Sequence, residues 1–289
     1  MFRIFAFAND KANFSIRRIR SFPKSKVNFY NFVMLNFAIQ TAREAGQILL
    51  DKYGRKINIS KKGDINLVTE ADLASEKLIV ERIKSYYPRH SILAEESGEA
   101  AVAGGDAKWK WIIDPLDGTT NFAHGYPCFC VTLALEHEGE IVIGVTYDPT
   151  RDEVFAAERG AGATLNGKKI RVSETEKLSE ALIVTGFPYD FAKRENFAHH
   201  LTQFLLHSRG VRRDGSAAID MAYVACGRYD GFWEEGLNPW DVAAGLLLIT
   251  EAGGRVSYYD GSPFSVYQPP ILASNGLIHG EMMEVLRAK

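Results

Sequence analysis

The chain has 289 residues, of which 46% are hydrophobic and 24% charged, and its formal net charge is -2 at pH 7. This composition is typical of a globular protein with ample material for a core, and the balanced charge gives no reason to expect direct nucleic-acid binding. The longest apolar run, VAAGLLLI at 242–249, is far shorter than the roughly 20 residues that cross a bilayer, so we expect no membrane partner.

Residues 1–33 differ from the rest, because they contain seven Lys or Arg and a single acid, Asp10. They lack the apolar stretch and cleavage site of a secretory signal. An organelle transit peptide is one interpretation; a disordered tail, or translated sequence upstream of a start at Met34, is another, which we favour. We therefore expect the folded domain at 34–289, as two closely packed lobes at roughly 34–180 and 181–289.

The three cysteines, Cys128, Cys130 and Cys226, have no regular spacing and indicate no disulfide framework. Cys128 and Cys130 lie in a strand-like run, where a metal or redox pair is one interpretation. Two ordinary core thiols are favoured by the burial habits of cysteine. This usage indicates a reducing, cytoplasmic environment.

Helical periodicity predicts a helix over 35–53, stopped by Gly54. A second helix is predicted over 69–86, capped by Thr69 and ended by Pro88. The segment HSILAEE then predicts a short strand that leads into a pair of glutamates.

Residues 109–172 change to strand patterns joined by short polar turns, which predicts an antiparallel meander. After residue 180, strands and helices alternate. The predicted strands are ALIVTGF, YDGFWEE, RVSYYD and ILASN, and the predicted helices are 191–208, GSAAIDMAYVAC, PWDVAAGLLLITEAGG and 277–287. Together these elements predict an α/β protein of the α+β layered kind, with alternating layers of helices and mixed or antiparallel sheets.

The first candidate functional motif is WIIDPLDGTTNF at 111–122, where two aspartates follow an apolar strand-like run. Because Pro115 cannot continue a central strand, we expect Asp114 to end that strand and Asp117 to lie one turn further on, both facing one point. Two such carboxylates repel unless a cation neutralises them, and oxygen ligands without paired His or Cys favour Mg²⁺ over zinc. For this motif alone, a polar turn with Asx-type capping is an equally good explanation.

The residues after Asp117 suit a phosphate ligand. Gly118 lets the backbone come close to a ligand, and the N–H groups of Gly118 and Thr119 can hold phosphate oxygens. Mg²⁺ commonly completes its octahedron with substrate phosphate. Thr119 can in addition orient a water molecule.

Other acids stand where they can join such a site. Glu95 and Glu96 lie at a strand end, Glu234 ends another strand, and Asp241 opens an apolar helix. Taken singly, each is better explained as a solvated acid or as a helix N-terminal acid favoured by the dipole. The question is whether these separate signals belong to one site.

Five segments, in this order along the chain, carry a family resemblance: DINLVTEAD, AEESGE, DPLDGTTNF, GSAAIDMAYVACGRYDGFWEEGLNPWD and WDVAAGLLLITEAGG. Over residues 35–287 the sequence resembles the inositol monophosphatase family, in particular its bacterial inositol-1-monophosphatase branch. This family belongs to the Mg²⁺-dependent, Li⁺-sensitive phosphatase superfamily that also contains fructose-1,6-bisphosphatases. The layered fold that the resemblance implies agrees with the predicted elements.

The resemblance implies a metal site with two or three Mg²⁺ ions, one pair of which Asp114 would bridge. The implied metal ligands are Glu95, Asp114, Asp117, Asp241 and the main-chain carbonyl of Leu116.

The resemblance also implies catalytic roles for Asp72, Thr119, Glu95 and Lys61, and it implies substrate-binding residues. Asp72 would pair with Thr119 to position the attacking water, and Lys61 would help to close the site, although Lys62 leaves that register open. Glu234 would bind a ring hydroxyl, with Glu235 as the competing choice. The implied substrate-binding residues are Gly118, Thr119, Ser216, Ala217, Glu234 and Asp241.

The implied activity is that of a phosphoric monoester hydrolase, which uses a metal-activated water to convert inositol 1-phosphate to myo-inositol and phosphate. Relatives with the same mechanism act on fructose 1,6-bisphosphate or 3'-phosphoadenosine 5'-phosphate. Arg212 and Arg213 are candidates to hold a second phosphate, although surface or dimer-contact arginines are the favoured interpretation.

A different class of function is a binding role, because some bacterial relatives take part in transcription antitermination with RNA polymerase, independently of catalysis. The family is often dimeric, so we expect a homodimer.

Overall fold

The computed structural model describes residues 26–55, 59–62, 66–100, 105–187 and 194–288, with only the backbone described at 26–31, 59–62, 66–68, 107 and 194–195. The helices are α1 (Lys26–Lys52), α2 (Glu70–Tyr86), α3 (Thr119–Ala123), α4 (Arg194–His207), α5 (Ala217–Ala225), α6 (Pro239–Glu251) and α7 (His279–Arg287), with a 3₁₀ turn at Leu178–Glu180. The strands of the first part of the chain are β1 (Ile59–Lys62), β2 (Asn66–Thr69), β3 (His90–Ala94), β4 (Gly98–Ala100), β5 (Asp106–Asp117), β6 (Cys130–His137), β7 (Glu140–Asp148), β8 (Glu153–Glu158), β9 (Gly162–Leu165) and β10 (Lys168–Lys169). Those of the second part are β11 (Leu182–Thr185), β12 (Gly210–Arg212), β13 (Gly231–Glu234), β14 (Arg255–Ser257) and β15 (Ile271–Ser274).

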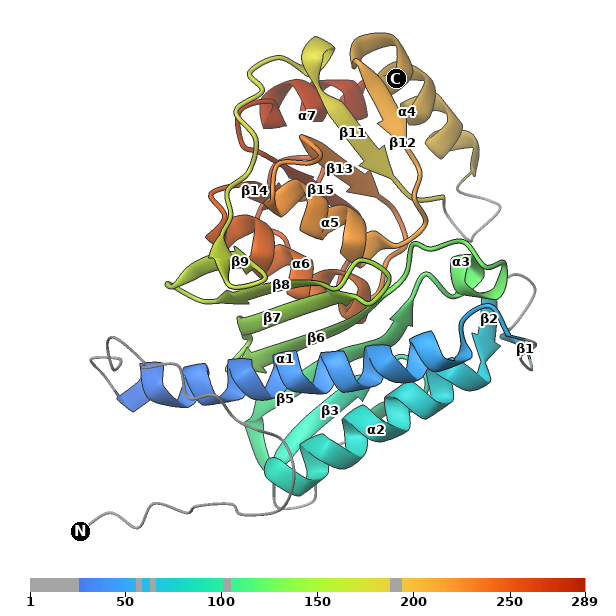
Figure 1. Ribbon diagram of the computed structural model, residues 1–289. Coiled ribbons are helices and arrows are strands. Elements are labelled where there is room, and N and C mark those ends of the chain that lie inside the picture. Colours follow the sequence, from blue (N-terminus) through green and yellow to red (C-terminus); the bar gives the residue numbers. More distant parts are fainter. Residues whose placement is uncertain (1–25, 56–58, 63–65, 101–104, 188–193, 289) are drawn as a thin grey trace.

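The larger sheet has the strand order β10-β9-β8-β7-β6-β5-β3-β4. Strands β5 to β10 pair antiparallel, which confirms the predicted meander, while β3 joins β5 in parallel. Helices α1 and α2 lie across one face of this sheet (Figure 1). Strand β5 is therefore a central strand with neighbours on both sides.

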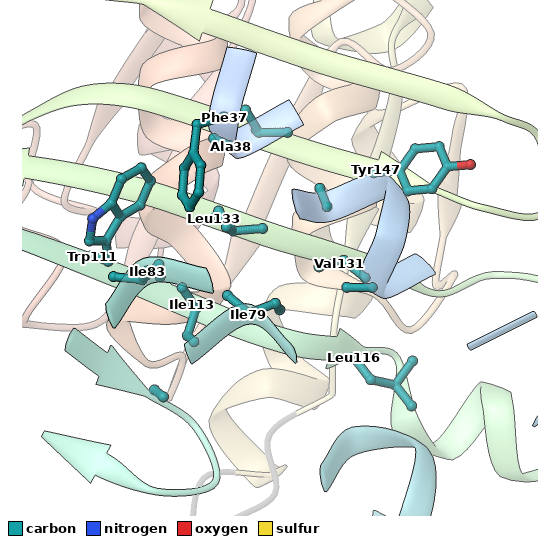
Figure 2. Close-up of a cluster of buried hydrophobic side chains, with 14 of the residues drawn as sticks. Phe37, Ala38, Ile79, Ile83, Trp111, Ile113, Leu116, Val131, Leu133 and Tyr147 are labelled. Atoms are coloured by element: carbon teal, nitrogen blue, oxygen red, sulfur yellow. The ribbon is translucent and has the colours of Figure 1, made fainter. Parts of the chain in front are cut away.

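The two faces of β5 contribute to different cores. Trp111 and Ile113 point toward α1 and α2, where they pack with Phe37, Ile79 and other buried apolar residues (Figure 2). Ile112, between them in sequence, belongs to the core on the opposite face, with α5 and α6. This alternation follows from the two-residue side-chain period of a strand, and it fixes which residues at the end of β5 face which layer.

The second sheet has the order β12-β11-β13-β15-β14 and mixes parallel with antiparallel pairs. Helices α5 and α6 lie between the two sheets, and α4 and α7 cover the outer face of the smaller one (Figure 1). The resulting order of helices, sheet, helices, sheet and helices confirms the predicted layered fold.

Helix α1 begins at Lys26, nine residues before the predicted start, and so crosses the boundary placed at residue 33. Its apolar packing begins later. Phe32 and Val33 are exposed, whereas Met34 and Phe37 are buried against α2 and the sheet. The earlier turns continue the backbone helix without a described side chain in the core, so the hydrophobic pattern could not reveal them.

The prediction that Asp114 ends its strand is wrong, because β5 continues through Pro115 to Asp117. The pairing shifts register between Asp114, opposite Thr132, and Asp117, opposite Cys130. Pairing with β3 has already ended at Ile113, so Pro115 needs no ladder partner on that side. The bulge accommodates the proline and leaves both aspartates on the strand.

The antiparallel hairpin of β1 and β2 and the short strands β4 and β12 were not predicted from the sequence. Each is four residues or fewer, too short for a clear alternation. Across the described residues, no helix is both long enough and apolar enough to traverse a membrane.

Candidate active site

A cavity lies where the end of β5 meets the N-termini of α5 and α6 and the end of β13. Among the described residues that line it, six are acidic and one, Arg213, is basic. The acidic lining residues are Glu95, Asp114, Asp117, Asp220, Glu234 and Asp241. Except for Glu96, the acids that were separate signals in the sequence therefore share one cavity, together with one acid, Asp220, that was not singled out.

Asp114 is the most enclosed acid at the end of β5, with 2% of its surface exposed. Its Oδ1 accepts a hydrogen bond of 2.9 Å from the Leu116 N–H. Burial, and then the charges of Glu95, Asp117 and Asp241, raise the pKa of Asp114 well above its usual range. A cation placed among these carboxylates would relieve that repulsion.

Asp117 is held from the far side of the cavity. Its Oδ2 accepts hydrogen bonds from the Ser216 hydroxyl at 2.6 Å and from the Ala218 N–H at 2.7 Å. Burial raises the pKa of Asp117, and these donors act in the opposite direction. Ser216 and Ala217 line the cavity as predicted, but the side chain of Ser216 is turned to Asp117.

Asp241 occupies the first turn of α6. Asn238 precedes the helix, and the Asp241 Oδ2 accepts a 2.7 Å hydrogen bond from its N–H, so the two form a capping box with Pro239 in the first turn. Burial and the charge of Asp117 raise the pKa of Asp241 well above its usual range. The cap explains why a helix begins here, and Asp241 lines the cavity together with the other acids.

The donor set suits a hard divalent cation, because it consists of carboxylates and carbonyl oxygens. In the described part of the chain, no three acidic, His or Cys side chains already stand as a finished ligand cluster. An ion of this type characteristically keeps several waters and substrate oxygens, so an incomplete protein shell is compatible with Mg²⁺.

Thr119 and Asp72 meet beside this acidic group, although 47 residues separate them in the chain. The Thr119 hydroxyl lies 3.2 Å from Asp72 Oδ1 and 3.0 Å from the Leu116 carbonyl oxygen. Asp72 is fully buried in the first turn of α2 and accepts two hydrogen bonds from Thr69. Burial raises the pKa of Asp72, which makes it a better proton acceptor.

Gly118 sits between β5 and α3 with φ 93°, in the left-handed region. A Cβ at this position would lie 2.8 Å from the Cys128 carbonyl oxygen, so another residue would clash as well as strain the turn. The first N–H groups of α3, beginning with Thr119, have no acceptor within the helix. They are therefore available to a ligand in the cavity.

The structure distinguishes Glu234 from Glu235. Glu234 is buried and lines the cavity, where burial and the charges of Asp241 and Asp117 raise its pKa well above the usual range. Glu235 follows β13 and does not line the cavity; its Oε1 lies 3.7 Å from His200 Nδ1.

Arg212 and Arg213 also differ in whether they line the cavity. Arg213 lines the cavity and places its guanidinium 4.7 Å from the ring centroid of Phe187, another lining residue. Arg212 ends β12 and does not line the cavity, and both arginines are exposed.

Lys61 and Lys62 lie on β1, where their backbones pair with Leu67 and Asn66. Their side chains are outside the described residues, so the predicted role of Lys61 stays a prediction. Cys128 and Cys130 are buried, and burial raises the pKa of the Cys130 thiol, which confirms core thiols.

Three features of the site were missed by sequence reasoning. The buried Ser75 hydroxyl of α2 donates a 2.8 Å hydrogen bond to the Pro115 carbonyl at the bulge. The Ala218 N–H holds Asp117. Asp220 is an acid on an otherwise apolar helix, and this contrast is the sequence signal that could have identified it as a candidate site residue.

Comparison with known proteins decides the family, because a model described as the inositol monophosphatase family matches residues 32–289. The chain belongs to the inositol monophosphatase family. Members of this family are phosphoric monoester hydrolases that generally depend on Mg²⁺, and the present chain is an enzyme of this kind.

Individual relatives agree with this assignment. The chain is 48% identical over 256 residues to an inositol-1-monophosphatase of Synechocystis sp., covering 88% of each chain. It is 44% identical to the Nus factor SuhB of Pseudomonas aeruginosa, covering 84% of this chain and 91% of that protein. A solved structure, the inositol monophosphatase from Anabaena (Nostoc), is 46% identical over 88% of this chain and 95% of the other, with a TM-score of 0.79.

Proposed function

We propose that this enzyme hydrolyses a phosphate monoester of a small polyol, with inositol 1-phosphate as its substrate. The observation that carries the proposal is the convergence, in one cavity, of acids from five separate segments beside the Thr119–Asp72 pair. We assign the metal ligands to Glu95, Asp114, Asp117, Asp241 and the Leu116 carbonyl, for two or three Mg²⁺ ions.

Bound Mg²⁺ supplies charge neutralisation for the phosphate and lowers the pKa of a water molecule. The protein positions and deprotonates the attacking water through Thr119. When the Thr119 hydroxyl donates to Asp72 Oδ1, its oxygen lone pairs are free to accept a hydrogen bond from that water. A proton can then pass from the water to Thr119 and from Thr119 to Asp72, whose raised pKa favours acceptance.

The remaining lining residues lie on two walls of the cavity, and each wall would contact a different part of the substrate. Gly118 and Thr119 would hold the phosphate, since Gly118 allows close approach and the first α3 amides are available. On the opposite wall, Glu234 would accept a hydrogen bond from a ring hydroxyl, and the backbone at Ser216 and Ala217 would contact the polyol. Two proteins named as inositol phosphatases, from Synechocystis and Anabaena, support inositol 1-phosphate as the substrate.

A bisphosphate is the second candidate substrate, and the placement of Arg213 in the cavity favours it. A second phosphate beyond the reacting one would gain a charge-assisted hydrogen bond from this guanidinium. Arg213→Ala should then weaken hydrolysis of fructose 1,6-bisphosphate or 3'-phosphoadenosine 5'-phosphate and leave inositol 1-phosphate hydrolysis unchanged.

The decisive experiment measures phosphate release by the purified chain from these three substrates, with and without Mg²⁺. We expect Mg²⁺-dependent release that is strongest on inositol 1-phosphate and lost in Asp114→Asn. The Cys226→Ala variant, away from the lining residues, serves as the matched control. Normal turnover by Asp114→Asn would refute the metal-centred scheme, and a preference for a bisphosphate would move the substrate while keeping the mechanism.

Binding to RNA polymerase stays a separate prediction, supported by the likeness to the Nus factor SuhB of Pseudomonas aeruginosa. A pull-down of RNA polymerase with wild-type chain and with the Asp114→Asn variant would test it, since a role independent of catalysis predicts equal recovery with both. Homodimer formation also stays a prediction, which sedimentation of the full chain would test.

A further inference from the structure

The carboxylate of Asp220 is the least satisfied polar group in the active-site cavity. Asp220 lies in the first half of α5, has 1% of its surface exposed and lines the cavity. Neither of its oxygens has a hydrogen-bond partner, and no other described lining residue has a buried side-chain atom in this state. A buried carboxylate without donors costs free energy, so its presence needs an explanation.

Neighbouring acids make the position of Asp220 still less favourable for stability. The charges of Asp214, Glu234 and Asp117 act on it in the same direction as burial and raise its pKa well above the usual range. Arg213 acts in the opposite direction, but its guanidinium lies over the Phe187 ring and donates no hydrogen bond to Asp220. The folded chain therefore leaves both oxygens without a donor at the edge of the cavity.

The other aspartates around the cavity differ from Asp220, because each has a donor from the protein. Asp114 accepts from the Leu116 N–H, Asp117 from the Ser216 hydroxyl, and Asp241 from the Asn238 N–H. Asp114 and Asp117 lie on β5 and Asp241 on α6. Asp220 lies on α5 and is subject to the charges of Glu234 and Arg213, which also line the cavity.

We propose that Asp220 is a specificity-determining residue that accepts a hydrogen bond from a ring hydroxyl of the phosphorylated polyol. This inference rests on the proposed function. A polyol suits the site because each hydroxyl can donate one hydrogen bond, and two adjacent hydroxyls match the two acceptors, Asp220 and Glu234. A monoester without such hydroxyls would leave Asp220 unpaired in a dehydrated site and would bind less well.

The test compares Asp220→Asn with the wild-type chain on inositol 1-phosphate, on analogues that each lack one ring hydroxyl, and on phenyl phosphate. We expect kcat/KM for inositol 1-phosphate to fall roughly 10- to 100-fold, mainly through KM, as for loss of a hydrogen bond to a charged group. Hydrolysis of phenyl phosphate, and of the one analogue that lacks the contacted hydroxyl, should be unchanged by the substitution.

The matched control is Asp230→Asn, because Asp230 is also buried but accepts hydrogen bonds from Ser173 and Leu182 and lies outside the cavity lining. We expect Asp230→Asn to lower Tm with KM unchanged, and Asp220→Asn to leave Tm unchanged or raised.

Three results would overturn the inference: an equal loss on every substrate, no loss on any, or a weakened Mg²⁺ dependence with KM unchanged. If instead the wild-type chain releases no phosphate from any substrate with Mg²⁺, the proposed function itself fails, and this outcome is distinguishable from the other three.

Discussion

Removal of Mg²⁺ should make the stability of this protein fall as pH rises. In the metal-free chain the pKa values of Asp114 and Asp241 are raised well above their usual range, by burial first and then by neighbouring acids. The folded state therefore holds protons that the unfolded state has already released. The resulting penalty is absent below the ordinary pKa of 3.8, grows as pH rises above it, and is complete once pH exceeds the raised values.

The size of the effect follows from proton and ion linkage. Each proton bound by the folded but not the unfolded state lowers the unfolding free energy by about 1.4 kcal/mol per pH unit. Mg²⁺ at about 100 times its Kd adds roughly 2.7 kcal/mol, or about 5 to 10 °C in Tm for a chain near this size. Because the ion requires ionised carboxylates, its stabilisation increases with pH. The stability curves with EDTA and with Mg²⁺ should therefore diverge as pH rises.

Thermal unfolding of the full chain, followed by circular dichroism from pH 5 to 8 in EDTA and in saturating Mg²⁺, measures both curves. Asp114→Asn removes one of the mutually repelling charges, so in EDTA it should raise Tm at pH 8 and flatten the pH dependence, while the Mg²⁺ shift is lost. Asp51→Asn, on the exposed side of α1, is the control and should leave both curves unchanged. A flat EDTA curve, together with an Mg²⁺ shift that survives Asp114→Asn, would refute the reasoning.

Two further substitutions separate the roles of the cavity residues. Thr119→Ala should lower kcat by roughly 10²- to 10⁴-fold, which is the usual contribution of a positioned acid–base group. The Mg²⁺-induced rise in Tm should persist in this variant. Loss of that rise would instead mean that Thr119 supports the metal site. Gly186→Ala places a methyl group where it would overlap the Glu234 carboxylate. In steady-state kinetics, this substitution should raise KM for inositol 1-phosphate about tenfold. In urea unfolding, it should lower the free energy of unfolding by about 1 to 3 kcal/mol at most. An unchanged KM would count against Glu234 as a substrate contact.

Much of the acidic cavity could be predicted because its residues lie in motifs whose local physics is visible in the sequence. An acid that follows an apolar run in the sequence, such as Asp114, or opens a helix behind Asn and Pro, such as Asp241, is marked by its neighbours. The pairing of Thr119 with Asp72 needed the family resemblance, because no local rule joins residues 47 apart.

The parts that escaped prediction depend on tertiary contacts. Glu234, the last residue of β13, lines the cavity, whereas Glu235, the next residue, lies near His200, and only the tertiary packing around the strand end decides this. Asp220 could not be placed because its environment is assembled from Asp214, β13 and β5 as well as its own helix.

A hydrogen bond from α2 supports the path of β5 at Pro115, and its contribution can be measured. The fully buried hydroxyl of Ser75 donates to the Pro115 carbonyl at 2.8 Å, so α2 anchors the bulge that sets Asp114 and Asp117 on one strand. Ser75→Ala removes that donor without touching a metal ligand, and should cost about 1 to 3 kcal/mol of stability. Because the anchor orients the ligands, Mg²⁺ affinity should also fall, roughly 10- to 100-fold.

The matched control is Ser85→Ala, on the exposed part of the same helix, which should change neither quantity. Mg²⁺ titrations of activity and of Tm would measure the affinity of each variant. A lower Tm for Ser75→Ala with unchanged Mg²⁺ dependence would show that the bulge keeps its shape without α2. The orientation of Asp114 and Asp117 would then have to come from pairing with β6 and from the donors on α5 alone.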